Sequence, residues 1–322
     1  MEKRTDLKNK INSAALCGTP FLFALNYELT DGFVIENPLD QTDILWRVGN
    51  HSNFTPQKIT SQSTQIDADA MPIEKYAEKF NYVKNQLLEG NSFLANLTVK
   101  TPVNTDFSLK EILCHCNSPY ALLIPDKLVC FSPEIFVKIR NNKISSNPMK
   151  GTISANENNA ENTILSDYKE SAEHFTIVDL IRSDLSRVAT NITVDRLRYI
   201  DRLKTSKGDI LQVSSEISGE ILDGYKGRLG DMIFELLPAG SISGAPKQPT
   251  VNVIQQAESE PRGFYTGVFG YFDGSELDSA VMIRYIEREE GQMFFRSGGG
   301  ITINSVCEDE YNEVLAKIYL PF

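Results

Sequence analysis

The stretch Ala172-Glu-His-Phe-Thr-Ile-Val-Asp-Leu-Ile-Arg-Ser-Asp-Leu-Ser-Arg-Val188 carries the clearest helical pattern of the sequence. Its apolar residues recur every three or four positions, which places them on one face of a helix. The pattern predicts a single long helix over about residues 162–189. The apolar residues that define it are Phe175, Val178, Ile181, Leu185 and Val188.

Short apolar or alternating runs on both sides of this helix have the pattern of β-strands. Helical periodicity is also found over 73–89 and 308–319, and another helix is predicted to begin near Pro246, because proline suits the first helical turn. The elements come in mixed blocks rather than in strict βαβ alternation. The sequence therefore predicts the α+β class, with a large, mostly antiparallel sheet assembly and helices packed outside. The predicted strands are 93–99, 121–125, 128–131, 136–139, 212–218, 265–272, 280–287 and 293–297.

Composition and charge narrow the class of protein further. The chain has 322 residues, of which 41% are hydrophobic and 23% charged, as is typical of a globular protein with a sizeable core. The formal net charge of -11 argues against binding of nucleic acid, whose phosphates would repel it. No run reaches the roughly 18 apolar residues of a membrane span, and the N-terminus lacks the apolar region of a signal peptide. The five cysteines fit no disulfide framework. We therefore expect a cytoplasmic protein that binds neither nucleic acid nor membrane.

Two pairs of glutamates repeat the same spacing on two predicted helices. Glu170 and Glu173 lie one turn apart in the long helix, and Glu310 and Glu313 lie one turn apart in the last. Like charges at this spacing share one helix face and repel by about 0.2–0.5 kcal/mol. Taken alone, the pairs fit solvated helix faces. Brought together, the four carboxylates would form a hard-oxygen site suited to Mg²⁺.

Three further segments combine glycine, proline and charged residues near the ends of predicted elements. In Asn147-Pro-Met-Lys-Gly-Thr152 a lysine lies between a proline-stiffened turn and a glycine, and Lys150 could be a nucleophile if buried, because burial lowers a lysine pKa. A second segment leads into the helix predicted near Pro246 and reads Pro238-Ala-Gly-Ser-Ile-Ser-Gly-Ala-Pro-Lys247. The free backbone N–H groups at the start of a helix can bind an anion. Ser297-Gly-Gly-Gly300 permits close approach of backbone or ligand, and Arg284 could pair with a carboxylate. Each segment also fits a purely structural role.

Five motifs in a fixed order resemble those of the chorismate-binding enzymes, which include anthranilate synthase component I, aminodeoxychorismate synthase component I, isochorismate synthases and salicylate synthases. The resemblance extends from about residue 71 to the C-terminus, whereas residues 1–70 match poorly apart from the strand-like segment 20–25. It implies one chorismate-utilising domain over 1–322, built as a layered sandwich of two large, mostly antiparallel sheets with helices packed outside. The motifs are Pro148-Met-Lys-Gly-Thr152, Ala172 to Val188, Pro238 to Lys247, Arg262-Gly-Phe-Tyr-Thr-Gly267 and Gly298-Gly-Gly-Ile301.

The resemblance implies a role for each matching residue. In the family, the carboxylates at the places of Glu173 and Glu310 bind Mg²⁺, and those at the places of Glu170 and Glu313 hold metal-bound waters. The metal grips the ring carboxylate of chorismate and can polarise it. The groups that hold or contact the substrate match Gly151, Thr152, Tyr265, Arg284, Gly298, Gly299, Gly300 and Lys317.

Lys150 favours one activity within the family. Aminodeoxychorismate synthases carry a lysine here, whereas anthranilate and isochorismate synthases typically carry alanine. Phe131-Ser-Pro-Glu-Ile-Phe136 places Glu134 at the position of the family's general acid. The resemblance implies that Lys150 attacks ring C2 while Glu134 protonates the departing C4 hydroxyl, after which ammonia adds at C4 and displaces the lysine. The product would be 4-amino-4-deoxychorismate, the precursor of 4-aminobenzoate and folate, and a glutamine amidotransferase subunit would supply the ammonia.

Three departures from the family pattern leave alternatives open. Leu211 stands where the family usually has a histidine, and residues 182–187 read Arg-Ser-Asp-Leu-Ser-Arg in place of the family's Arg-Asn-Asp-Leu-Gly-Arg. The N-terminal part is shorter than in full-length relatives. Because some relatives bind tryptophan in that part, feedback by tryptophan is not expected. One alternative is anthranilate synthase component I, against which Lys150 argues. The other is a non-catalytic chorismate-binding homologue, which Leu211 motivates and the intact Lys150, Glu134 and four glutamates oppose.

Overall fold

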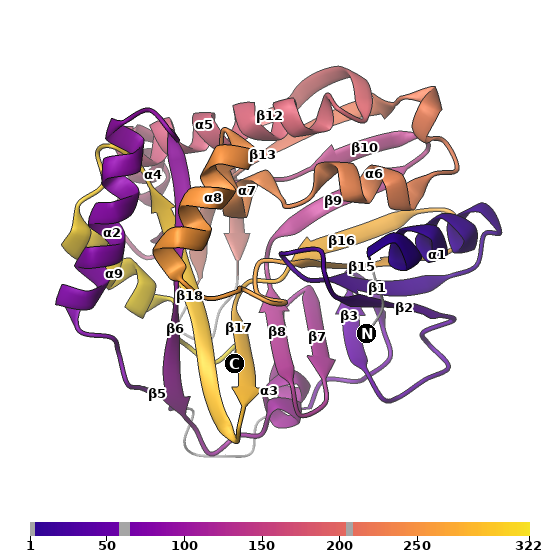
Figure 1. Cartoon of the computed structure of the whole chain (residues 1–322), viewed down its shortest axis with the longest axis horizontal. Helices are drawn as coiled ribbons and strands as arrows, with labels where there is room; N and C mark the ends of the chain where they lie inside the picture. The colour runs from indigo at the N-terminus through magenta and orange to yellow at the C-terminus, as the bar shows by residue number, and fades with distance from the viewer. Residues whose placement is uncertain (1–3, 58–64, 204–208) are drawn as a thin grey trace.

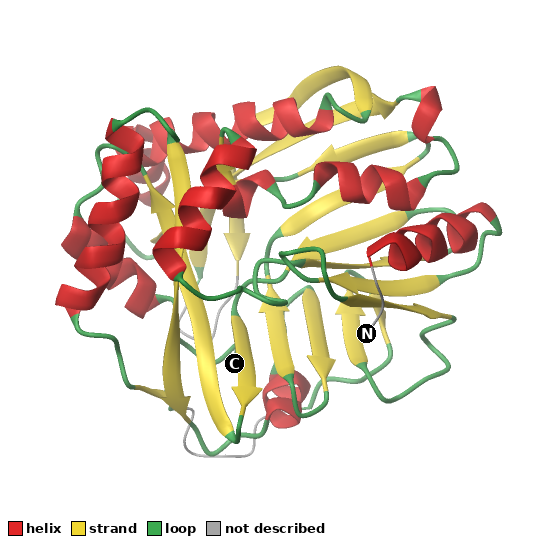
Figure 2. Cartoon of the chain, in the orientation of Figure 1, coloured by secondary structure: helices red, strands yellow, loops and turns green. Residues whose placement is uncertain are grey.

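Two antiparallel β-sheets form the centre of the protein, whose computed structural model describes residues 4–57, 65–203 and 209–322. Within these residues each sheet has nine strands, and every strand pairing is antiparallel (Figure 1). Helices lie around the sheets, as the colouring by secondary structure shows (Figure 2). The predicted layered α+β sandwich of two large antiparallel sheets is confirmed.

The strand order gives each sheet its shape. The first sheet has the order β11 (Met149–Ser154), β13 (Ile210–Ile221), β10 (Lys143–Ser146), β9 (Ile135–Arg140), β16 (Leu277–Val281), β15 (Val268–Phe272), β1 (Phe21–Leu25) and β2 (Gly32–Glu36), with β12 (Ala189–Leu203) paired to β13. The second has the order β14 (Gly244–Ala245), β6 (Leu94–Asn104), β18 (Gln292–Ile301), β17 (Tyr285–Glu289), β8 (Leu128–Ser132), β7 (Tyr120–Ile124), β3 (Leu45–Val48) and β4 (His51–Ser52), with β5 (Asp67–Ala68) paired to β6.

The helices of the described segments cover the outer faces of the sheets. Helices α1, α5 and α6 share an apolar cluster with the first sheet, in which Ile11, Ile181 and Ile233 pack with strand residues. Helices α2, α8 and α9 share another with β6 and β18 of the second sheet. The helices are α1 (Arg4–Leu16), α2 (Ile73–Leu88), α3 (Leu109–His115), α4 (Ala160–Ser166), α5 (Tyr168–Leu185), α6 (Leu229–Leu236), α7 (Gly240–Ser243), α8 (Lys247–Glu258) and α9 (Cys307–Ala316), with a 3₁₀ turn at Asp223–Tyr225.

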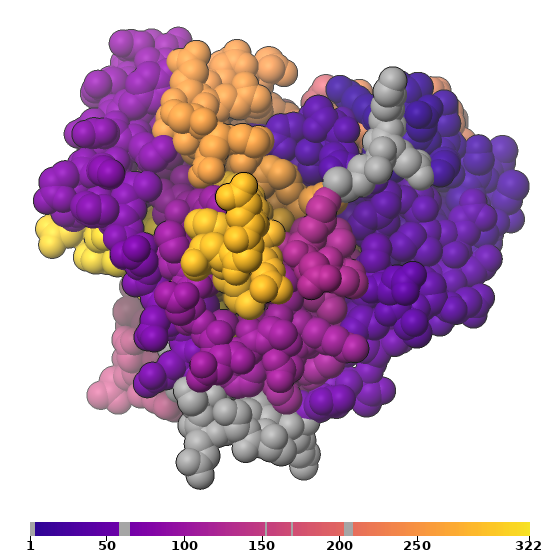
Figure 3. All heavy atoms as spheres, turned by 60° about the horizontal axis from the view of Figure 1, so that its bottom comes forward, coloured from indigo at the N-terminus to yellow at the C-terminus, as the bar shows by residue number. Residues whose placement is uncertain are grey.

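A further apolar cluster joins the two sheets face to face. Leu22 and Phe269 of the first sheet contribute to it together with Trp46 and Leu122 of the second, and all four side chains are buried. Interdigitating apolar faces of this kind are what holds two sheets in a sandwich. The space-filling view shows the yellow C-terminal part of the chain between magenta and purple segments, so that regions far apart in sequence share one face (Figure 3).

Two predicted elements are each divided in the structure. The helix expected over 162–189 is broken at Asp167, whose carboxylate accepts a 2.8 Å hydrogen bond from the backbone N–H of Glu170 and so begins α5. Phe175 is 48% exposed rather than buried, and Val188 lies beyond the helix end. The strand expected over 280–287 is broken at Arg284, which has a φ of +53°.

None of the helices in the described segments has the length and apolar character that crossing a membrane requires.

Candidate active site

Three of the predicted site residues lie where the chain passes between the sheets. Glu134 lies between β8 of the second sheet and β9 of the first, and Arg284 lies between β16 of the first and β17 of the second. Tyr265 precedes β15, on the segment that leads from α8 back to the first sheet. Lys150, by contrast, lies in the edge strand β11 of the first sheet, which the sequence did not predict as a strand.

Lys150 contacts a predicted metal ligand. Its Nζ lies 3.0 Å from Glu173 Oε2, and the two side chains are 24% and 9% exposed. Burial lowers the pKa of Lys150, but the carboxylates of Glu173, Glu313 and Glu170 more than offset burial, so the pKa is raised above its usual value. The simple expectation that a buried lysine becomes neutral is therefore wrong for this arrangement of charges.

Glycines allow the carboxylates to approach the backbone. A Cβ atom on Gly299 would lie 3.3 Å from Glu310 Oε2 and 3.6 Å from Glu313 Oε1. Gly151 has a φ of +76° beside a bulge in β11, and a Cβ atom there would lie 3.2 Å from Glu170 Oε2. The glutamates of α5 and α9 thus reach the glycines of β11 and β18, which helical spacing alone could not reveal.

Lys150 and Lys317 bring positive charge to the same place. A Cβ atom on Gly300 would lie 3.5 Å from Lys150 Nζ. Lys317 Nζ donates to Gly298 O at 2.6 Å and lies 2.7 Å from Glu313 Oε1. Burial lowers the pKa of Lys317, and the attraction of Glu313 opposes that shift.

The four glutamates have the chemistry of a magnesium site but are not gathered as one. Carboxylate oxygens are the ligands that Mg²⁺ prefers. In the described residues, however, no three His, Cys, Asp or Glu side chains lie close enough to hold a metal ion. Instead, the ammonium of Lys150 pairs with Glu173. The donor set therefore matches Mg²⁺ by ligand type, whereas its four carboxylates on α5 and α9 are not gathered around one point.

Glu134 has the surroundings of a general acid. Burial raises the pKa of its carboxyl group, while a hydrogen bond from Ser241 and the charges of Lys150, Arg284 and Lys317 act in the opposite direction. Ser241 Oγ donates to Glu134 Oε1 at 2.5 Å. A carboxyl group kept out of water holds its proton to higher pH than an exposed one, as proton donation requires.

The remaining predicted residues are placed as follows. Arg284 Nε donates to the hydroxyl of Tyr319 at 2.9 Å. Tyr265 is buried, and burial raises its pKa to about 12, while the charges of Arg262 and Arg284 act to lower it. The backbone of Thr152 is in β11, but its side chain lies outside the described part of the structure.

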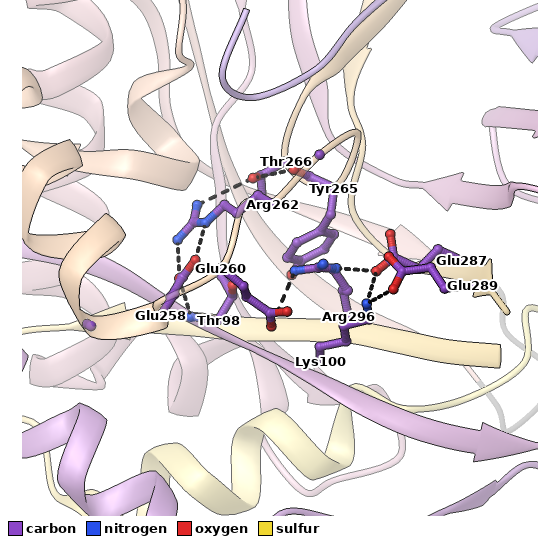
Figure 4. Close-up of polar contacts among 12 residues, drawn as sticks. Thr98, Lys100, Glu258, Glu260, Arg262, Tyr265, Thr266, Glu287, Glu289 and Arg296 are labelled. Carbon is purple, nitrogen blue, oxygen red and sulfur yellow. Dashed lines mark hydrogen bonds and ion pairs between the residues drawn. The ribbon is translucent and has the colours of Figure 1, made fainter. Parts of the chain in front are cut away.

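A network of buried ion pairs surrounds Tyr265 (Figure 4). On one side, Arg262 forms a two-pronged pair with Glu258, with distances of 2.9 Å from Nε to Oε2 and 2.6 Å from Nη2 to Oε1. On the other, Arg296 Nε lies 2.6 Å from Glu287 Oε1. Sequence analysis missed this network, although the spacing of Glu258 and Arg262, four residues apart at the end of a predicted helix, is a signal that could have suggested their pairing.

Arg262 also joins backbone segments next to the site. Its Nη1 donates to Ile242 O at 2.9 Å, and its Nη2 donates to Asn96 O at 2.6 Å. Ile242 follows Ser241, the donor to Glu134, and Asn96 pairs with Gly300 across β6 and β18. One side chain thus links Glu258 of α8, Ile242 of α7 and β6, the strand that pairs with Gly298–Gly300 of β18.

Leu211, at the place of the family histidine, is buried in β13 opposite Ile153 of β11. A separate cavity of about 500 Å³ lies between α1 and α6, with Arg4, Lys8 and Arg228 in its lining, and it contains none of the predicted site residues.

Sequence comparison identifies the family of the chain. The profile of the chorismate binding enzyme family matches residues 32–321. The chain belongs to that family. Among curated proteins, an uncharacterized PabA-like protein of Haemophilus influenzae is 47% identical over 308 residues, which cover 94% of this chain and 92% of that protein.

More distant family members with named activities are of two kinds. Aminodeoxychorismate synthase component 1 of Bacillus subtilis is 31% identical over 259 residues, covering 76% of this chain and 54% of that protein. Anthranilate synthase component 1 of Archaeoglobus fulgidus is 33% identical over 254 residues, covering 76% and 61%. Identity alone does not separate the two activities.

The solved structures agree on the fold. A putative 2,3-dihydroxybenzoate-specific isochorismate synthase from Bacillus anthracis superposes with a TM-score of 0.72 at 19% identity, covering 99% of this chain and 88% of that one. The whole described chain, including its N-terminal strands, therefore follows the architecture of a chorismate-utilising enzyme.

Proposed function

We propose that this chain is aminodeoxychorismate synthase component I. It would convert chorismate and ammonia to 4-amino-4-deoxychorismate for 4-aminobenzoate and folate synthesis. The observation that carries the proposal is the position of Lys150, whose amine lies beside Gly300 and within hydrogen-bonding distance of Glu173. At the position of Lys150, aminodeoxychorismate synthases carry a lysine, whereas anthranilate and isochorismate synthases typically carry an alanine.

The chemistry divides between Lys150 and Glu134. Lys150 must lose a proton to solvent before it attacks, because Glu173, whose Oε2 lies 3.0 Å from the Lys150 Nζ, is assigned to Mg²⁺ and stays ionised. The amine then forms a bond to ring C2, the ring double bonds shift, and the C4–O bond breaks as Glu134 gives its proton to the departing hydroxyl, which leaves as water. Ammonia next forms a bond to C4, the double bonds shift back, the C2–N bond to Lys150 breaks, and the Glu134 carboxylate takes the proton from the new amine.

The remaining residues hold the substrate. Arg284 and Lys317 are the cations that face Glu134 together with Lys150, and they suit a substrate with carboxylates. The backbone of Gly298–Gly300 has no side chains to prevent close approach of a ligand. We assign Tyr265 and the Gly151–Thr152 backbone to the same pocket.

The proposal includes a metal ion and a partner. Glu173 and Glu310 would bind Mg²⁺, and Glu170 and Glu313 would hold its waters. When bound, the ion would neutralise and polarise the ring carboxylate of chorismate. Ammonia would come from a glutamine amidotransferase subunit.

Anthranilate synthase component I is the second candidate, because relatives with that activity have comparable identity. The two activities are separated by product analysis. Purified protein would be incubated with chorismate, Mg²⁺ and an ammonium salt at alkaline pH, and the products separated by chromatography with and without added 4-aminobenzoate lyase. We expect aminodeoxychorismate, which the lyase converts to 4-aminobenzoate. Anthranilate would refute the assignment, and absence of turnover with ammonia and with an added amidotransferase subunit would favour a non-catalytic homologue.

A further inference from the structure

A small cavity borders the carboxyl group of Glu134. Its volume is about 20 Å³, and its lining comes from Glu134 and β9, from α5 and from the segment around α7. A cavity of roughly 10–15 Å³ already holds one molecule of the size of water. The cavity therefore has room for a single small molecule beside the proposed general acid.

The wall of the cavity is mostly hydrocarbon. Val137, Ile181, Leu185 and Ala239 all line it, and all four are buried. Two polar groups in the lining, besides Glu134, already have partners: the hydroxyl of Ser241 donates to Glu134, and the carboxylate of Asp184 pairs with Lys247 at 2.7 Å. A cavity of this kind favours a neutral guest over an ion, because burial of an unpaired charge is strongly unfavourable.

The position of the cavity matters for the proposed reaction. Glu134 is the group assigned to the C4 hydroxyl, and the incoming nitrogen must form its bond at the same carbon. Ammonia has about the size of a water molecule. It is neutral and carries the lone pair that attacks, whereas ammonium, with one more proton, is charged and has no free lone pair. A guest in this cavity would be next to the carboxylate that takes up the proton once the C–N bond has formed.

We propose that this cavity is the binding site of the ammonia molecule that attacks C4. The inference rests on the proposed function. In the reaction, the nitrogen lone pair forms the C4–N bond, the C2–N bond to Lys150 breaks, and one proton passes from the new amine to Glu134. Chorismate itself does not enter the cavity, so filling it affects the use of ammonia and not the binding of chorismate.

Two substitutions fill the cavity without changing its charge. Ala239→Val and Val137→Ile each add hydrocarbon to side chains in its lining. The control is Ala14→Val, at a buried alanine of α1 that does not line the cavity. Initial rates would be measured against ammonium chloride at saturating chorismate, and the affinity for chorismate would be measured separately by calorimetry.

We expect the KM for ammonia to rise about tenfold in both filling variants, as for a misfitted methyl group in a closed pocket, with the affinity for chorismate unchanged. Ala14→Val should leave both constants as in the wild type. An unchanged KM for ammonia in both filling variants, with wild type making aminodeoxychorismate, would overturn the ammonia site alone. A wild-type protein that makes no nitrogen-containing product would overturn the proposed function and the ammonia site with it.

Discussion

Replacing Arg262 with methionine should destabilise the protein strongly, because it leaves a buried charge without its partner. The Arg262 and Glu258 side chains are 1% and 3% exposed. In Arg262→Met, the backbone N–H of Thr98 is the one donor that the Glu258 carboxylate keeps among the partners described. The backbone carbonyls of Ile242 and Asn96 each lose the hydrogen bond that they accept from Arg262. Breaking a buried pair in this way costs about 3–5 kcal/mol.

The magnitude can be converted into a shift of the melting temperature. For 322 residues, an unfolding entropy of about 2.1 cal/mol/K per residue gives about 0.7 kcal/mol/K, so a loss of about 4 kcal/mol lowers Tm by about 6 °C. Scanning calorimetry would compare Arg262→Met with the double variant Arg262→Met/Glu258→Leu. We expect the double variant to recover most of the loss, since neither charge is then buried alone.

The control is Arg140→Met, which removes an exposed ion pair with Glu276. Such pairs contribute about 0–1 kcal/mol, so the Tm should change little. The reasoning would be refuted by a Tm of Arg262→Met close to that of Arg140→Met, or by a double variant no more stable than Arg262→Met.

Two further predictions concern the proposed acid and the proposed metal ligands. Ser241→Ala removes a hydrogen bond that lowers the pKa of Glu134, so this pKa should rise further. Because a general acid acts while protonated, the alkaline limb of the pH profile of kcat/KM should move to higher pH, and an unmoved limb would contradict the role of Glu134. Glu310→Gln removes a charge beside Gly299 and should abolish Mg²⁺-dependent turnover, together with the heat of Mg²⁺ binding in calorimetry. Equal Mg²⁺ dependence in the variant and the wild type would exclude Glu310 as a ligand.

Much of the fold follows from short-range patterns. The periodicity over 73–89 predicts a helix that the structure has at Ile73–Leu88, and the apolar runs predict strands such as β7, β8 and β18, although not the long strand β12. The failures have local causes. Asp167 caps a new helix inside an unbroken periodic pattern, and Arg284 turns the chain from one sheet to the other within a run that has the composition of one strand.

The candidate site was less accessible to sequence reasoning. Spacing identified the glutamate pairs, and the motifs identified Lys150 and Glu134. The pairing of Lys150 with Glu173 depends on how β11 lies against α5, and no local pattern encodes it. Arg262 binds two backbone carbonyls, which every residue possesses, so its partners could not be recognised from residue types.

The most direct test of the proposed activity is product analysis of Lys150→Ala beside the wild type, with chorismate, Mg²⁺ and ammonia. The control is Lys138→Ala, whose lysine is 27% exposed, close to the 24% of Lys150, and pairs with Asp278 in the first sheet. We expect aminodeoxychorismate from the wild type and from Lys138→Ala, and its loss or strong slowing in Lys150→Ala. Undiminished formation of aminodeoxychorismate by Lys150→Ala would show that the lysine is not the nucleophile.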